Sequence, residues 1–178
     1  YFEVFWAAQR SGLYCTPINW HLKAEEVEYI LQDCGASALV TSVALRHVLD
    51  GLGDALAAVP TRLVIDGDLD GFERYESAIE RFPAEPLAEE MEGSYMFYSS
   101  GTTGRPKGIK PPLTRGAFGS GGGALIALIQ GMYHFTADTV YLNPAPLYHA
   151  APLGWTTSVQ RLGGTVVVME KYDPEQAL

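Results

Sequence analysis

The chain has 178 residues, of which 47% are hydrophobic and 19% are charged, and its 12 basic and 21 acidic residues give a formal net charge of −9. This length and composition are ordinary for a globular domain or for a large piece of one. The negative charge argues against binding to nucleic acid or anionic lipid, because no run of lysine or arginine offsets it locally. An anionic ligand would therefore need a specific local binding site, because the overall charge would repel it.

The first third of the chain contains two helical patterns. Residues 1–10 are apolar on nearly all sides, which predicts a buried helix capped by Gly12. The segment Ala24–Cys34 repeats apolar residues at helical spacing, with acidic residues opposite, and Gly35 follows as a terminator. The sequence then predicts a buried strand over 38–41, a helix over 43–49, a strand over 62–66 and a helix over 72–82.

The second half alternates strands and helices. A strand over 95–98 leads directly into a loop rich in serine, threonine and glycine. A helix over 124–132, a strand over 139–143, a helix over 154–162 and a strand over 165–169 follow. This order predicts an α/β fold with one or more mostly parallel sheets flanked by helices.

Both ends fall inside predicted elements. The helix over 1–10 has no capping residue before it, and Asp173, Pro174 and Glu175 form a helix start only a few residues before Leu178. We therefore expect residues 1–178 to be an excised piece, truncated at both ends. Two cysteines, Cys15 and Cys34, are too few for a disulfide framework and lack metal-ligand spacing. With no transmembrane segment or signal peptide in the sequence, we expect a cytoplasmic protein.

The segment Tyr98–Gly108 reads YSSGTTGRPKG and combines hydroxyls, glycines and two cations. Its glycines let backbone amides approach an anion closely, its hydroxyls donate further hydrogen bonds, and Lys107 supplies a point charge. By composition alone, a solvated turn after a strand would be the favoured explanation. A P-loop of the NTPase type is excluded, because Lys107 is preceded by Pro106 and followed by Gly108.

The ordered pattern YSSGTTGRPKGI resembles the phosphate loop of the adenylate-forming superfamily, which includes acyl-CoA synthetases, luciferases and peptide-synthetase adenylation domains. The resemblance implies that this loop contacts the β- and γ-phosphates of ATP. The implied nucleotide-binding residues are Ser99, Ser100, Gly101, Thr102, Thr103, Gly104 and Lys107. The family pattern differs after Gly108, where residues 109–112 read IKPP, so the role of that segment is open.

A second motif follows after a helix and a strand. The segment 143–152, NPAPLYHAAP, resembles the proline–aromatic–histidine motif of the same family, in which the aromatic and the histidine border the acyl substrate. The resemblance assigns Tyr148 and His149 to substrate binding, and Lys107 and His149 to catalysis. Taken alone, His149 would more simply be a satisfied histidine in a proline-rich loop. Residues 5–41 resemble the family too, so the likeness covers essentially the whole chain.

The resemblance implies a partial N-terminal AMP-binding domain of the acyl-CoA synthetase fold, without the small C-terminal domain. The family motifs for adenine, ribose and the hinge are absent from the sequence, as is the acid that helps to bind magnesium, so we predict no metal ligand here. The implied reaction joins a carboxylic acid to AMP with release of pyrophosphate, and then to a thiol. Its cofactors would be ATP, Mg²⁺ and coenzyme A.

Several alternatives remain open at this point. A fatty acid is the first choice of substrate, while aryl or amino acids and transfer to a carrier protein are alternatives. The chain by itself could be a non-catalytic phosphate-binding fragment, and a homo-oligomer is compatible with the pattern. The glycines of 119–123 fit a dinucleotide motif only in isolation, without the strand that such a motif needs before it. His21, His47 and His134 show no metal spacing, and we expect Trp155 to be packed in the core.

Overall fold

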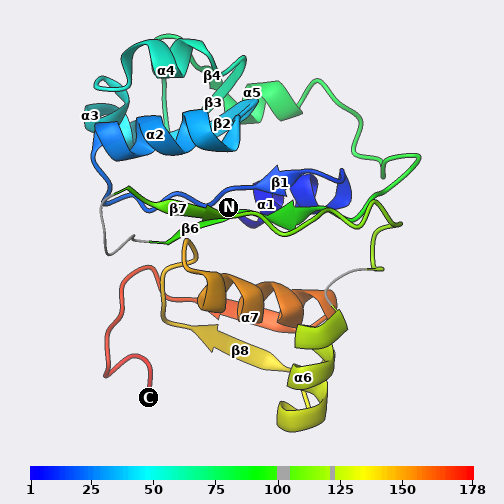
Figure 1. Cartoon of the computed structure of the whole chain (residues 1–178). Helices are drawn as coiled ribbons and strands as arrows, with labels where there is room; N and C mark the ends of the chain where they lie inside the picture. Colours follow the sequence, from blue (N-terminus) through cyan, green and yellow to red (C-terminus); the bar gives the residue numbers. More distant parts are fainter. Residues whose placement is uncertain (100–104, 121–122) are drawn as a thin grey trace.

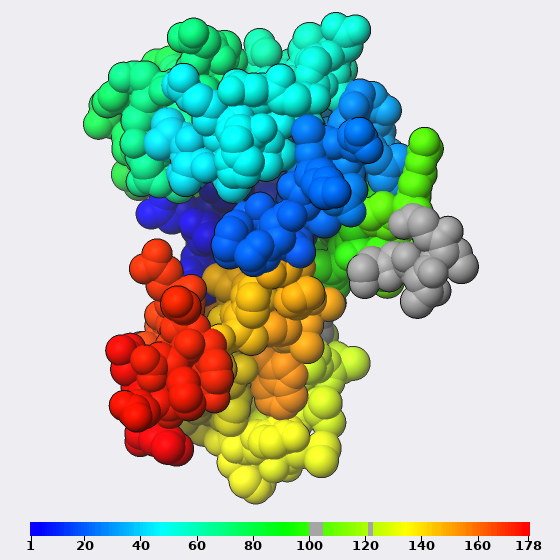
Figure 2. Space-filling model, turned by 90° about the vertical axis from the view of Figure 1, so that its left-hand side faces the viewer, coloured from blue at the N-terminus to red at the C-terminus, as the bar shows by residue number. Residues whose placement is uncertain are grey.

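The computed structural model describes residues 1–99, 105–120 and 123–178. Its elements lie in three tiers (Figure 1), and Figure 2 shows the same tiers from the side, with cyan segments above blue ones and gold to red segments below. The upper tier holds residues of the first half of the chain. The lower tier holds residues after 123, and the middle tier carries strands that lie between the two.

The upper tier is built on a parallel sheet in the order β2-β3-β4. Its side chains form a buried apolar core in which Leu52 and Val64 are 1% and 0% exposed. The strands are β2 (Ala38–Ser42), β3 (Thr61–Ile65) and β4 (Glu73–Arg74). The helices are α2 (Ala24–Cys34), the 3-10 turn η1 (Val43–Leu45), α3 (Arg46–Leu49), α4 (Gly53–Ala57) and α5 (Tyr75–Ile79).

The middle tier contains helix α1 (Phe2–Arg10) and two pairs of short strands. Strand β1 (Tyr14–Cys15) pairs in parallel with β5 (Ser94–Tyr95). Strand β6 (Phe97–Ser99) pairs with β7 (Lys107–Ile109), and this pair is antiparallel. The chain therefore changes partner at Met96, between β5 and β6.

The lower tier is a second parallel unit. Strand β8 (Val140–Asn143) pairs with β9 (Thr165–Val168), and helix α7 (Ala150–Arg161) connects them. Helix α6 (Gly123–Tyr133) precedes β8. Leu153, Thr156 and Val159 of α7 are completely buried, so this helix is the best anchored element of the tier.

A buried ion pair joins the middle and lower tiers. Arg161 at the end of α7 forms a salt bridge with Glu92, whose side chain is 5% exposed. The Glu92 carboxylate also accepts a hydrogen bond of 2.7 Å from the Gly119 backbone amide. The Arg161 guanidinium lies over the rings of Trp6 and Phe118, at 5.5 and 5.0 Å from their centroids. Four distant segments thus meet at one point.

The predicted α/β class with flanking helices is confirmed, and so are the exact bounds of α2 and its left-handed terminator Gly35, with φ of 64°. The β6–β7 pair is an antiparallel exception that the sequence did not predict. Helix α4 was also missed. It has only five residues, too few to show a helical period.

Several expected boundaries were wrong. Helix α1 is not buried all round, since only Phe5 and Gln9 are buried, and its cap is Ser11, with the left-handed turn one residue later at Gly12. The helix expected over 72–82 is only Tyr75–Ile79, because residues 73–74 pair with β3 first. The strand expected over 95–98 is divided at Met96. Helix α7 begins at Ala150 rather than Gly154, and residues 174–177 form a turn and not a helix.

No helix among the described residues is long and apolar enough to cross a membrane.

Candidate functional site

The β6–β7 pair brings two predicted phosphate ligands together. Ser99 lies directly opposite Lys107 in the antiparallel register, and the Ser99 hydroxyl donates a hydrogen bond of 3.5 Å to the Lys107 carbonyl. Opposite residues of an antiparallel pair project their side chains to the same face of the sheet. Both side chains are exposed. A hydroxyl and a cation therefore lie on one face at the end of this hairpin.

The remaining residues of the predicted phosphate loop lie outside the described residues. These are Ser100, Gly101, Thr102, Thr103 and Gly104. Their assignment to ATP binding stays a prediction.

The segment between β8 and α7 carries the second motif. Asn143 is 1% exposed, and its side-chain amide donates a hydrogen bond of 2.7 Å to the Ala145 carbonyl. The Tyr1 hydroxyl donates to the Leu147 carbonyl at 2.9 Å. A buried asparagine and the start of α1 therefore fix the course of the segment that ends in Tyr148 and His149. The role of Asn143 was not predicted from the sequence, although an asparagine at the end of a predicted strand was a usable signal.

His149 is the N-cap residue of α7, with extended backbone angles and no side-chain cap hydrogen bond. Its imidazole is exposed, and its ring centroid lies 4.6 Å from that of Tyr148, which is half-buried. Because the imidazole is not used to cap the helix, it is available to a ligand beside the Tyr148 ring.

One buried cluster contains residues that lie close in sequence to each of the two motifs. Phe97 of β6 packs with Phe5 of α1 and Leu153 of α7, and Leu147 packs against the same cluster. Phe97 lies two residues before Ser99, and Leu153 lies four residues after His149. Figure 1 shows the segment before α7 directly below the β6–β7 pair. Residues close in sequence to Ser99 and to His149 thus share one buried cluster where the middle and lower tiers meet.

Cys15 packs against this cluster without serving as a nucleophile. Burial raises the pKa of its thiol to about 11, so the thiol is protonated at neutral pH. Burial also raises the pKa of Tyr1, whose hydroxyl remains a proton donor. Cys34 is half-buried, its thiol points to the Leu31 carbonyl at 3.7 Å, and burial raises its pKa too. Both cysteines are packing residues.

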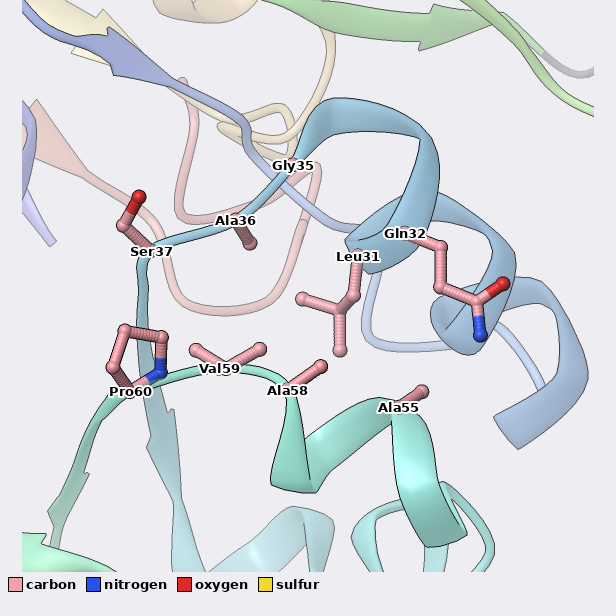
Figure 3. A pocket seen from close by; sticks show the side chains of 9 residues that line it. All are labelled: Leu31, Gln32, Gly35, Ala36, Ser37, Ala55, Ala58, Val59 and Pro60. Carbon is pink, nitrogen blue, oxygen red and sulfur yellow. The ribbon is translucent and has the colours of Figure 1, made fainter.

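Two hollows among the described residues lie elsewhere. A cavity of about 340 Å³ between α2 and α4 is lined by residues such as Leu31, Ala55 and Val59, with Leu31 pointing into it (Figure 3). A second hollow of about 410 Å³ is lined by Trp20, His21 and His47, among others. Neither lining includes Ser99, Lys107, Tyr148 or His149.

The remaining sequence predictions concern metal ligands and Trp155. In residues 1–99, 105–120 and 123–178, no three His, Cys, Asp or Glu side chains gather as metal ligands do. Trp155 is half-buried and makes an edge contact with Tyr133 at 5.0 Å between centroids, next to Phe135 at 6.1 Å. This agrees with a packing role.

The comparisons with known proteins agree with this geometry. The sequence profile of the family described as AMP-binding enzyme matches residues 1–178. An indoleacetate–CoA ligase of Aromatoleum aromaticum is 33% identical over 95% of this chain and 33% of its own length. A fatty acid–[acyl-carrier-protein] ligase of Streptomyces coeruleorubidus is 28% identical over 100% of this chain and 33% of its own length.

Among solved structures, a protein assigned as a long-chain-fatty-acid CoA ligase in Rhodopseudomonas palustris has a TM-score of 0.79 and 25% identity, over 99% of this chain and 43% of that one. The chain spans about a third of the length of the curated relatives that it matches. Since the family profile matches residues 1–178 and the fold is similar to that of the solved ligase structure, this chain belongs to the AMP-binding enzyme family.

Proposed function

We propose that residues 1–178 are a partial N-terminal AMP-binding domain of a longer ATP-dependent acid–thiol ligase. The observation that supports this proposal is the buried cluster in which Phe97, two residues before Ser99, packs with Leu153, four residues after His149, and with Leu147. Adenylation needs the two motifs close together, because the carboxylate must reach the α-phosphate while the leaving pyrophosphate is held.

In the proposed first step, a substrate carboxylate attacks the α-phosphorus of ATP, and the bond to the bridging oxygen of pyrophosphate breaks. Ser99 and Lys107 would hold the β- and γ-phosphates by a hydroxyl hydrogen bond and a positive charge, together with Ser100, Gly101, Thr102, Thr103 and Gly104. Mg²⁺ bound to the phosphates would neutralise further charge.

At the other side of the site, Tyr148 and His149 would border the acyl carboxylate. The exposed imidazole and the adjacent ring offer one polar and one apolar contact to the acid. In the second step, a thiol displaces AMP from the acyl-adenylate. Coenzyme A is the proposed thiol.

For the substrate we propose a fatty acid. The relatives named above act on different acids, since one is an indoleacetate ligase and another loads a fatty acid on an acyl-carrier protein. An aryl acid and a carrier-protein acceptor are therefore the alternatives. A cytoplasmic location fits this chemistry, which uses soluble ATP and coenzyme A.

The test is carboxylate-dependent exchange of pyrophosphate into ATP, measured with the complete protein and Mg²⁺ but without a thiol. Long-chain, short-chain and aromatic acids are compared at equal concentration. Exchange with long-chain acids alone is the expected result, and exchange only with aromatic acids would correct the substrate. A folded protein that exchanges with no acid would refute adenylation.

The acceptor is then tested by adding coenzyme A or a phosphopantetheinylated carrier protein to the acid that supports exchange. Formation of the acyl-CoA thioester is expected. The 178-residue chain alone serves as a further sample, because titration calorimetry with Mg-ATP measures directly whether it retains phosphate binding.

A further inference from the structure

Helix α2 contacts the residue that leads into the phosphate loop. The Tyr98 hydroxyl on β6 donates a hydrogen bond of 2.6 Å to the Asp33 carboxylate on α2. Partial burial and the adjacent carboxylate raise the pKa of Tyr98, so the phenol stays protonated and the hydrogen bond is charge-assisted at neutral pH. Tyr98 immediately precedes Ser99.

The same helix contacts the residue that follows the loop. The Arg105 guanidinium lies over the Tyr29 ring, with 5.4 Å between Cζ and the ring centroid. The Tyr29 ring also meets the Tyr98 ring edge-on, with centroids 6.4 Å apart and an interplanar angle of 86°. Tyr29 and Asp33 are four residues apart, so they share one face of α2. One helix face therefore touches the chain on both sides of residues 100–104.

Helix α2 is a rigid support for these contacts. Val27, Ile30 and Leu31 are buried in the upper tier, at 7%, 1% and 4% exposed. The β7 strand, in contrast, is exposed throughout. Gly108 of β7 lies so close to the Tyr98 ring that a Cβ atom there would come within 3.1 Å of Tyr98 Cζ. The Tyr98 ring is thus held between α2 and β7.

We propose that Tyr29 and Asp33 are positioning residues, which brace Tyr98 and Arg105 so that Ser99 and Lys107 are presented to the triphosphate of ATP. The proposal rests on the proposed function, because it requires that Ser99 and Lys107 bind phosphates. Neither Tyr29 nor Asp33 needs to touch the nucleotide. Their effect is to hold Ser99 and Lys107 in place before ATP binds, so that these two residues lose less conformational freedom on binding.

The test compares variants of the complete protein by the Kd for Mg-ATP, measured by calorimetry, and by the melting temperature. Asp33→Ala should weaken Mg-ATP binding about tenfold, the scale of one lost charge-assisted hydrogen bond. Asp33→Asn keeps an acceptor for the Tyr98 hydroxyl and should restore most of the affinity. If charge alone decided the Kd, Asp33→Ala would bind Mg-ATP more tightly, because it removes a negative charge near an anion site.

Two further variants separate the positioning effect of Tyr29 and Asp33, called the brace below, from a general loss of stability. Tyr98→Phe removes only the hydroxyl and should weaken binding as much as Asp33→Ala, with no further loss in the double variant, because both changes break the same hydrogen bond. Tyr75→Phe is the matched control. Its hydroxyl also bonds a carboxylate, that of Glu3 at 3.1 Å, but it lies on α5, outside the brace. It should leave the Kd unchanged.

The outcomes distinguish this inference from the proposed function. An unchanged or lower Kd in Asp33→Ala, with or without a fall in melting temperature, would overturn the brace and leave adenylation standing. A wild-type protein that binds Mg-ATP but exchanges with no acid would refute adenylation, while the Kd difference between Asp33→Ala and Asp33→Asn would still support the brace. A wild-type protein that does not bind Mg-ATP would overturn both.

Discussion

The two motifs of the candidate site are held in place by different means. Tyr148 and His149 directly precede helix α7, in which Leu153, Thr156 and Val159 are each 0% exposed. Lys107 lies on β7, a strand that is exposed along its whole length. Burial fixes the acyl motif, whereas the phosphate motif depends on strand pairing and on a few surface contacts. A change in the core should therefore affect stability, and a change on the hairpin should affect ligand binding.

The largest effect that tests this difference is expected at Leu153. Leu153→Ala should lower the free energy of unfolding by about 2–5 kcal/mol, because it leaves a cavity in the cluster shared with Phe5 and Phe97. Ile109→Ala removes a similar aliphatic side chain from β7, where Ile109 is 59% exposed, and should cost less than about 1 kcal/mol. Urea denaturation of the two variants measures both values. Equal losses would contradict the contrast between core and hairpin.

A smaller effect on free energy, but a larger one on activity, is expected at Lys107. Lys107→Ala should lower kcat/KM for ATP in the exchange reaction by about 10- to 100-fold, the value of one charge-assisted contact to phosphate. Since Lys107 is exposed, the melting temperature of Lys107→Ala should stay near that of the wild type.

The matched control for Lys107 is Lys110→Ala. Lys110 is the next lysine along the chain, and its ammonium lies 4.9 Å from the Tyr14 ring centroid. Its removal changes the local charge equally and should alter kcat/KM by less than about threefold. Normal adenylation by Lys107→Ala would remove Lys107 from the site.

The smallest effect concerns Cys15, at the edge of the buried cluster. Its pKa of about 11 lies above the ordinary value because burial disfavours the thiolate. Alkylation of Cys15 should therefore be slow at pH 8 and keep accelerating above pH 9, where an ordinary thiol levels off. Mass spectrometry of the labelled peptide follows the rate. In denaturant the rate should rise to that of a free thiol, and a fast reaction in the native protein would show that the cluster is open at Cys15.

Prediction from the sequence was most accurate where one local signal decided the structure. Helix α2 has a clear apolar period and a glycine terminator, and both its ends were predicted correctly. The region 72–82 had a helical period too, but residues 73–74 join the β3 edge instead. Pairing between distant segments overruled the local pattern there.

The candidate site shows the same division. Ser99, Lys107, Tyr148 and His149 were predicted as site residues because short ordered motifs carry them. The contacts that hold the motifs in place, from Asp33 to Tyr98 and from Asn143 to Ala145, were not found. Contacts such as Asp33–Tyr98 join residues far apart in the chain, and an aspartate on an acidic helix face gives no sign of its partner.

The meeting of Gly119 and Arg161 at Glu92 also has a consequence for folding. The segment between Gly119 and Arg161 has about forty residues and contains α6, β8 and α7. It forms a closed loop, because both of its ends contact the buried Glu92 carboxylate. Closure costs chain entropy once, and every contact inside the loop then forms at a high effective concentration. Residues 119–161 should accordingly open and close as one cooperative unit, with the amide protons of α6, β8 and α7 exchanging at a common rate.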